Sequence, residues 1–435
     1  MPAVNLANTI LGAGMLGLPG AFAKWGILMG CIGLVVAGSA AGFALHLLSE
    51  CADYVGRPAG FYQVAERAQP RLGIVIDFAV AIKCFGVASS YLTVVADSMT
   101  LVVRGSGWAS TRGFWVLMAM LASAPPSFLR RMDMLRFTSL VALACILGIV
   151  LLVILFATPA LDACEGAAIT PHSPSSTGGS ECGGEVDILP TQGAVSFLNK
   201  ISTFVFAYTC HQNIFSLTNE LYEPTTARVN VTIVASIGSA MVLYLIVSLC
   251  GYLTYGNDVG SDILEEYPTT PIVSVARVAI SLVVVFSYPL QLHPARASIK
   301  SIVNFCAEHC CGAAPPPEPS HKSGFDERSA HPEVLCRFGP TFGGKMAPDD
   351  SMHYLITGLF LPLSFLIAFT VTDLGIILGV VGAIGSTTIS YILPGFCFWR
   401  LRPDGASTLK VTLAFILFVV GCIIMPLALT MVFIS

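Results

Sequence analysis

The sequence predicts an all-α integral membrane protein with about eleven transmembrane helices. Only 11% of its 435 residues are charged and 55% are apolar, whereas soluble domains carry about 25% charged residues. The apolar residues run in long continuous windows instead of alternating at every second position, which favours helices over a β-barrel. The net charge of −4, without a basic arm, gives no indication of a nucleic-acid partner. The expected environment of this chain is the lipid bilayer.

The expected spans are charge-poor windows close to the ~20 residues that cross a bilayer. The first five are 2–23, 25–49, 74–103, 113–129 and 137–157. The other six are 193–219, 229–253, 278–295, 351–372, 374–399 and 411–435. The third span contains Asp77, Lys83 and Asp97, which we expect to be structural, with an Asp77–Lys83 link as one way to pair two of them.

The lysines and arginines of the loops predict a cytosolic N-terminus and an extracellular or lumenal C-terminus. In that orientation the outer loops contain three basic residues, Lys24, Arg104 and Arg112, and the remaining loop lysines and arginines are cytosolic. The long outer loop, 158–192, is rich in Ser, Gly, Thr and Pro, and the long cytosolic loop, 306–350, has mixed charge. Neither loop is apolar enough to form a domain, so residues 1–435 are expected to form a single transmembrane domain.

The first span is interrupted by Gly12, Gly14 and Gly17, where an ordinary transmembrane helix would continue. Unpaired backbone groups are unfavourable in lipid, so a broken helix persists where it lines a cavity or binds a solute. Close helix packing is the alternative reading of such glycines. Pro19 and the polar Asn8 favour a binding site.

The freed backbone groups of this first break suit a zwitterionic ligand. Amides at the start of the second half-helix attract an anion such as a carboxylate, and carbonyls at the end of the first half-helix attract a cation. The expected substrate-binding residues are Gly12, Ala13, Gly14, Met15 and Leu16.

A second break is expected in the sixth span, within the polar run from Tyr208 to Asn213. His211 is a candidate proton carrier because histidine titrates near physiological pH, and the alternative is a neutral histidine bonded to a backbone carbonyl. Phe206 and Tyr208 are candidates for the wall around a substrate side chain, or for simple packing.

A third group of candidates lies in the eighth span, which contains Pro289 and Pro294. The hydroxyl of Ser287 could complete a shell of hard oxygen ligands for sodium, together with groups of Asn8 and Leu11 at the first break. The alternative is a helix that is merely kinked by its prolines.

Cys164 and Cys182 are the cysteines of the outer loop, and we expect a disulfide between them in an oxidising compartment. The sequence contains no nucleotide-binding motif of the form GxxxxGK[ST], which argues against an ATP-driven pump. No catalytic residues and no cofactor are expected, apart from sodium or a proton as a coupling ion.

Four segments together carry a family resemblance. They are residues 5–19 (NLANTILGAGMLGLP), 206–211 (FAYTCH), 288–296 (YPLQLHPAR) and 381–395 (VGAIGSTTISYILPG). In combination they resemble the amino acid/auxin permease family, which includes sodium-coupled neutral amino acid transporters and vacuolar amino acid transporters. The eighth-span segment is more similar to the vacuolar branch than to the sodium-coupled one.

The resemblance implies a LeuT-type fold, in which two inverted five-helix repeats are followed by one extra helix. The repeats would cover about 1–157 and 193–399, and the extra helix about 408–433. It also implies amino acid binding at the two breaks, with sodium held by the residues around Asn8 and Leu11 and by Ser287.

The leading functional hypothesis is a secondary active transporter of neutral amino acids, coupled to a proton or sodium gradient by alternating access. The alternative is an amino acid sensor that signals through cytosolic partners, for which 306–350 is the available docking segment. A metal-ion carrier is disfavoured because the spans lack a cluster of carboxylates and thioethers. The plasma membrane and the vacuolar or lysosomal membrane both remain open, as does the oligomeric state.

Overall fold

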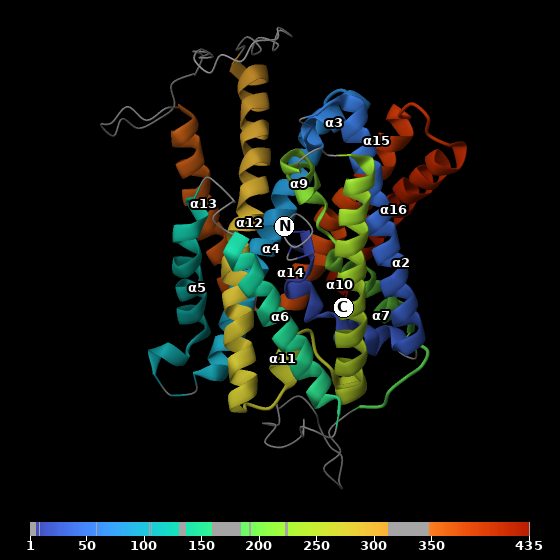
Figure 1. The fold of residues 1–435 in the computed structure, drawn as a ribbon. Coiled ribbons are helices and arrows are strands. Elements are labelled where there is room, and N and C mark those ends of the chain that lie inside the picture. The colour runs from blue at the N-terminus through green and yellow to red at the C-terminus, as the bar shows by residue number, and fades with distance from the viewer. Residues whose placement is uncertain are drawn as a thin grey trace.

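The computed structural model describes the chain as a bundle of helices (Figure 1). The described residues are 6–7, 9–57, 59–103, 105, 107–129, 136–158, 184–190, 193–221, 225–311 and 348–434. Within them, seven helices are long and apolar enough to cross a membrane, and Val141–Phe156 is a shorter apolar helix. An all-helical integral membrane fold is therefore confirmed, while the exact number of eleven crossings stays a prediction.

The N-terminal part consists of a short helical segment at residues 6–10, the 3₁₀ turn η1 (Ala13–Met15) and helix α2 (Leu18–Val55). Helix α2 contains the end of the first expected span and the whole of the second, with a kink at Gly26, whose φ of 70° is accessible to glycine without strain. A Cβ at Gly26 would lie 2.8 Å from the Leu189 carbonyl carbon. The helix therefore kinks at this one residue, against the backbone of the outer segment 184–190.

Four helices follow, α3 (Phe61–Ala68), α4 (Leu72–Val102), α5 (Arg112–Ser127) and α6 (Arg136–Phe156). Helix α4 lies at the centre of the bundle, because most of its apolar window is buried and it packs along α12. The short helix α3 was not expected from the sequence, where it lies in a cytosolic loop.

The sixth span is divided into α7 (Gly193–Asn199), α8 (Ile201–Ala207), the 3₁₀ turn η4 (His211–Asn213) and α9 (Ile214–Glu220). Next come α10 (Thr226–Tyr255), the short α11 (Ile263–Glu266) and α12 (Pro271–Cys311). The backbone of the sixth span thus leaves the helix between Ala207 and His211, inside the polar run.

The last part contains α13 (Pro348–Thr370), α14 (Leu374–Val381), α15 (Leu393–Leu401) and α16 (Thr408–Ile434). Between α14 and α15 the helix widens into two π-helical segments, η6 (Gly382–Ser386) and η7 (Thr388–Ile392). Helices α3 and α9 lie at one end of the bundle and α11 at the other (Figure 1). The predicted orientation places the α3 end in the cytosol.

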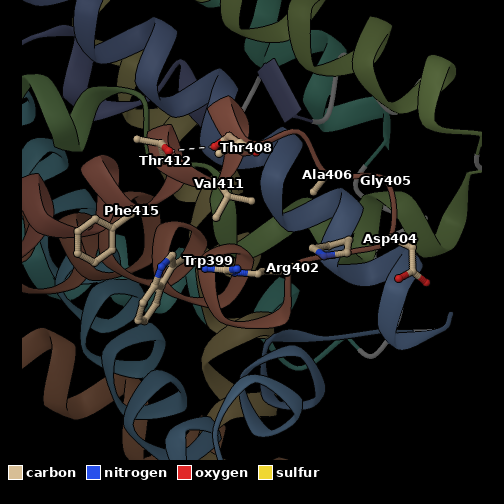
Figure 2. A pocket seen from close by; sticks show the side chains of 10 residues that line it. Trp399, Arg402, Asp404, Gly405, Ala406, Thr408, Val411, Thr412 and Phe415 are labelled. Atoms are coloured by element: carbon tan, nitrogen blue, oxygen red, sulfur yellow. Dashed lines mark hydrogen bonds between the residues drawn. The ribbon is translucent and has the colours of Figure 1, made fainter.

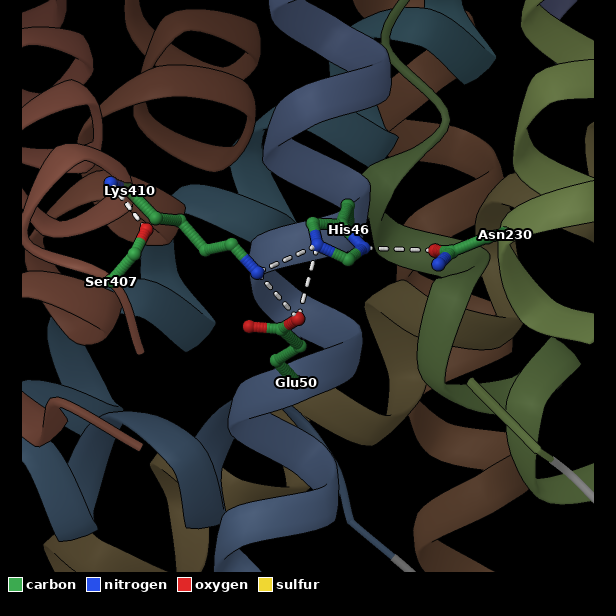
Figure 3. Close-up of polar contacts among 5 residues, drawn as sticks. All are labelled: His46, Glu50, Asn230, Ser407 and Lys410. Carbon is green, nitrogen blue, oxygen red and sulfur yellow. Dashed lines mark hydrogen bonds and ion pairs between the residues drawn. The ribbon is translucent and has the colours of Figure 1, made fainter. Parts of the chain in front are cut away.

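Helix α16 is attached to the bundle by a polar cluster at the α3 end (Figure 3). Lys410 Nζ lies 2.8 Å from Glu50 Oε1 and 3.3 Å from His46 Nε2. The other ring nitrogen, His46 Nδ1, lies 2.8 Å from Asn230 Oδ1. The cluster joins α16, α2 and α10, so it connects the C-terminal helix to both flanking elements.

Candidate transport site at the two helix breaks

The two interrupted helices meet in the core of the protein. A Cβ built at Gly14 would lie 3.2 Å from the Phe206 ring and 3.3 Å from the Ala207 Cα. Phe206 and Ala207 are the last residues of α8, so the first break lies directly against the second. Gly14 therefore provides the close backbone approach that a residue with a side chain would prevent.

Tyr244 of α10 joins the two breaks through a single hydroxyl. Its Oη lies 2.6 Å from the Ile10 carbonyl oxygen and 3.0 Å from the Ala207 carbonyl oxygen. Each carbonyl is at the end of an interrupted helix, where no intrahelical amide is available. The fully buried tyrosine thus shares its one hydroxyl proton between the two helix ends and holds them close together.

A second connection between the breaks lies at residues 9 and 213. Asn213 Nδ2 donates to Thr9 Oγ1 over 3.0 Å, which joins η4 to the short helical segment before the first break. The segment before the first break is therefore tied to η4 by this bond and to the end of α8 by Tyr244.

Helix α4 contributes Tyr91, whose Oη would lie 3.2 Å from a Cβ at Gly12. Gln291 Nε2 of α12 lies 3.4 Å from the same Tyr91 oxygen, and Gln291 Oε1 has no partner among the described residues. Ser287 precedes Gln291 by one helical turn and so lies on the same face of α12. Ser287 is buried, and its role at a sodium site stays a prediction.

The expected aromatic wall is buried at the second break. Phe206 and Tyr208 are 7% and 1% exposed. The Tyr208 ring packs edge-on against Tyr244, with 5.3 Å between centroids, and its hydroxyl has no hydrogen-bond partner among the described residues. An unpaired buried hydroxyl requires an explanation, and a polar ligand is one.

His211 lies immediately beyond the second break and is fully buried. Its Nε2 is 3.2 Å from the Ala41 carbonyl oxygen, and its Nδ1 is 3.0 Å from Ser390 Oγ. Ser390 Oγ is also 3.2 Å from Thr209 Oγ1, which itself donates to the Val205 carbonyl. The one proton of the Ser390 hydroxyl can point to either neighbour, so the network fits a neutral imidazole and a protonated one.

Lys83 and Asp77 do not pair, so the expected link between them is wrong. Six residues along a helix place two side chains about two-thirds of a turn apart. Asp77 lies beside Ser298 and Ser301 of α12. Lys83 instead faces the second break, within electrostatic reach of Cys210 and His211, and is 2% exposed.

The expected carboxylate site at the first break is partly engaged within the chain. The Met15 amide donates to the Gly12 carbonyl over 3.1 Å, so it is not free in this conformation. The Leu16 carbonyl accepts from the Ile263 amide at 3.2 Å. A Cβ at Gly20 would overlap the Gly260 carbonyl oxygen. The connection from α10 to α11 therefore covers the first break at the end opposite α3.

Asp262 stabilises this connection between α10 and α11, which covers the first break. Its Oδ1 accepts from the Leu264 amide at 2.9 Å and caps α11, whereas its Oδ2 has no partner among the described residues. The side chain is 2% exposed. Burial raises the pKa of Asp262, the charge of Asp97 acts in the same direction, and Arg277 opposes it.

Two expected elements lie outside the described residues. They are Asn8, proposed for the sodium site, and the Cys164–Cys182 disulfide. The side chain of Ala13 is likewise not described, although its backbone belongs to η1. Leu11 is buried, with its amide bonded to the Ala7 carbonyl. These assignments stay predictions.

An open pocket of about 460 Å³ lies apart from both breaks, at the connection between α15 and α16 (Figure 2). Its lining includes Trp399, Arg402, Asp404 and Phe415. Tryptophan and arginine together are typical of the boundary between membrane and water. We therefore assign this pocket to the membrane interface and not to the transported substrate.

Sequence reasoning missed Tyr244, Tyr91 and the position of Lys83. A tyrosine or lysine within an apolar span needs a polar partner for its hydroxyl or amine, so its presence in the sequence indicates a buried polar contact. The signal does not identify the partner, because the Ile10 and Ala207 carbonyls become available only once both helices are broken.

Comparisons with known proteins agree with this architecture. The family model described as transmembrane amino acid transporter protein matches residues 1–434. The chain is 34% identical over 459 aligned positions to vacuolar amino acid transporter 6 of Saccharomyces cerevisiae, covering 98% of this chain and 97% of the relative. It is 33% identical over 410 positions to vacuolar amino acid transporter 5 of Schizosaccharomyces pombe, covering 93% and 84%.

These matches confirm the resemblance drawn from the four sequence segments. They span nearly the whole chain, including both helix breaks, and the relatives are named as transporters and not as enzymes or sensors. The chain therefore belongs to the transmembrane amino acid transporter family and is a multi-pass membrane protein.

Proposed function

We propose that this protein moves neutral amino acids across the vacuolar membrane by proton-coupled alternating access. The observation that carries the proposal is the contact of Gly14 with Phe206 and Ala207, bridged by Tyr244. Two interrupted helices in mutual contact place half-helix ends of both signs at one point in the bundle, as a zwitterion requires. The names of the relatives, vacuolar amino acid transporters, support the vacuolar membrane.

The walls of the site favour a neutral side chain. Phe206 and Tyr208 are aromatic, and the Tyr208 hydroxyl and Gln291 Oε1 are uncharged polar atoms without partners among the described residues. A basic substrate would need a carboxylate beside these groups. The substrate carboxylate would be held by the amides between Ala13 and Leu16, after the Met15 amide has left the Gly12 carbonyl.

Proton coupling is supported by the network around His211. The imidazole can accept a hydrogen bond from Ser390, or donate to Ser390 once that hydroxyl has turned towards Thr209. No other contact must change, so the ring can gain and lose a proton within a closed core. A sodium site made by Asn8, Leu11 and Ser287 is the alternative that the experiments below separate.

Substrate identity is tested by exchange in proteoliposomes without any ion gradient. Vesicles loaded with one unlabelled amino acid are exposed to a trace of labelled amino acid, across neutral, acidic and basic members. We expect exchange for neutral amino acids and little for charged ones. Preferential exchange of charged amino acids would contradict the proposed substrate class, and exchange of none would contradict amino acid transport.

The role of His211 is tested with His211→Gln in the same vesicles. Glutamine can retain hydrogen bonds to Ala41 and Ser390 but cannot take up a proton. Accumulation driven by a pH gradient should fall about tenfold or more, within the range of general acid–base contributions, while exchange persists. Ser390→Ala, which removes only the hydroxyl, should reduce accumulation less. Unchanged pH-driven accumulation by His211→Gln would exclude His211 as the proton carrier.

A further inference from the structure

Lys83 is a cationic residue enclosed in the membrane-spanning core. It lies on the central helix α4 and is 2% exposed. The titratable groups that act on it are the thiols of Cys84 and Cys210, with no carboxylate among them. A charge within a lipid-spanning segment is unfavourable without a partner, and ionisable residues in such places mark ion or substrate pathways. A purely structural role does not explain a lysine for which the described residues supply no carboxylate partner.

The backbone of α4 touches the π-helical segment η6 at this residue. A Cβ built at Gly385 would lie 2.5 Å from Lys83 Cβ and 2.9 Å from Lys83 Cα. No side chain separates the two elements here. Widened π turns inside α-helices occur frequently at functional sites. The lysine stem therefore begins at a close approach of α4 to the irregular part of the tenth span.

The second break provides the neighbours of Lys83. Its charge acts on Cys210 and His211 beyond α8, and Cys84 on its own helix is the remaining titratable neighbour. No carboxylate is among these groups. The polar atoms next along the chain, Ser386 Oγ and both amide atoms of Gln212, lack hydrogen-bond partners among the described residues. The surroundings are thus polar, uncharged and suited to a group that changes its protonation.

We propose that the Lys83 amine is a proton-binding group of the transport cycle and shares the coupling proton with His211. When the core opens to water on one side, the amine accepts a proton from hydronium and becomes ammonium, leaving water. When the core opens to the other side, the ammonium returns the proton to water. Ammonium and imidazolium repel one another at this range, so the pair holds one proton at a time. This inference rests on the proposed proton-coupled function.

The test separates driven accumulation from exchange. Accumulation under a pH gradient requires proton movement with the substrate, whereas exchange between equal pH values does not. Lys83→Met removes the amine but keeps much of the stem, and Lys83→Arg keeps a cation that does not release its proton. Both variants should lose about tenfold or more of the pH-driven accumulation while exchange stays within about threefold of the wild type. Lys300→Met, on the part of α12 near the α3 end, is the matched control.

Several outcomes would overturn the inference. Accumulation close to wild type in Lys83→Met or Lys83→Arg would show that the amine is not part of the coupling. Loss of exchange together with accumulation, in a variant that stays monodisperse with a wild-type melting temperature, would assign Lys83 to substrate binding instead. If Lys83→Met does not fold, Lys83→Arg decides by the same criteria. A wild type that exchanges amino acids but ignores the pH gradient would refute the proposed coupling and this inference together.

Discussion

At the scale of single residues, the contact between the two breaks depends on the missing side chain of Gly14 and on the hydroxyl group of Tyr244. Gly14 has no Cβ, and the space that a Cβ would occupy is bordered by the Phe206 ring and the Ala207 backbone. Tyr244 places one hydroxyl against two carbonyls in a water-poor core, those of Ile10, which also accepts from the Gly12 amide, and Ala207. Both residues act on the same contact between the two breaks.

Replacing Gly14 with valine should abolish exchange and uptake. A Cβ alone would press on the Ala207 backbone at 3.3 Å, and the added methyl groups have less room still. Gly148→Val, at a site on α6 where a Cβ meets nothing within 4 Å, should leave transport intact. Transport is measured with correctly inserted protein of normal melting temperature. Normal transport by Gly14→Val would remove the first break from the mechanism.

Removing the hydroxyl of Tyr244 should weaken both stability and transport. In Tyr244→Phe the Ile10 and Ala207 carbonyls lose their shared donor, and although Ile10 keeps the bond from the Gly12 amide, the loss of a partner by the Ala207 carbonyl should cost roughly 1–3 kcal/mol. The half-maximal substrate concentration for exchange should rise because the two helix ends are no longer held together. Tyr54→Phe, on an exposed side chain, is the control. Equal melting temperatures and equal exchange kinetics in Tyr244→Phe and wild type would contradict the bridging role.

At the scale of elements, the account depends on which helices are interrupted and what covers them. The residues of both breaks could be predicted from sequence, because glycines and polar residues are out of place in a lipid-spanning helix. The π-helical segments η6 and η7 were not predicted, although residues 382–390 (GAIGSTTIS) also contain glycines and hydroxyl side chains. Such residues are equally common where helices pack closely, and these widened turns lie where α4 and α8 pack. Helix α11 was also missed because four residues carry no periodicity.

The cover formed by α11 should lose stability as the pH rises. The folded protein binds a proton at the buried Asp262 more tightly than the unfolded chain, because burial raises its pKa. The stabilisation is complete below the ordinary carboxyl range near pH ~4 and declines as the pH rises through the raised value. Asp262→Asn keeps a side chain that can cap α11 but removes the titration.

This pH effect is measured as the melting temperature of purified protein across a pH series. The melting temperature of Asp262→Asn should increase relative to that of the wild type as the pH rises. Asp404→Asn, at an exposed position at the other end of the bundle, should follow the wild type. A constant difference at all pH values would contradict the assignment of Asp262 as a buried proton-binding group.

At the scale of the whole molecule, composition and charge distribution were sufficient to predict a helical membrane protein. The seven long apolar helices and the family match confirm that much. The packing of the elements was beyond the sequence, because contacts such as Lys410 with Glu50 join residues at opposite ends of the chain. Nothing in the local pattern of either residue indicates its partner.

The Lys410 cluster should stabilise the molecule without taking part in transport. The groups are partly exposed, so Lys410→Met should cost about 1 kcal/mol or less of stability. Exchange should remain near wild type because helix α16 lies at the periphery of the bundle (Figure 1). A large loss of exchange with an unchanged melting temperature would show that α16 moves in the transport cycle.

The most direct measurement of the central claim is the accumulation of a neutral amino acid in proteoliposomes under separate ion gradients. One set of vesicles has a pH gradient and no sodium, and the other has a sodium gradient at equal pH. The account predicts accumulation above equilibrium with the pH gradient alone and none with sodium alone. Accumulation that requires sodium and ignores the pH gradient would contradict it and would point to Asn8, Leu11 and Ser287 as the coupling site.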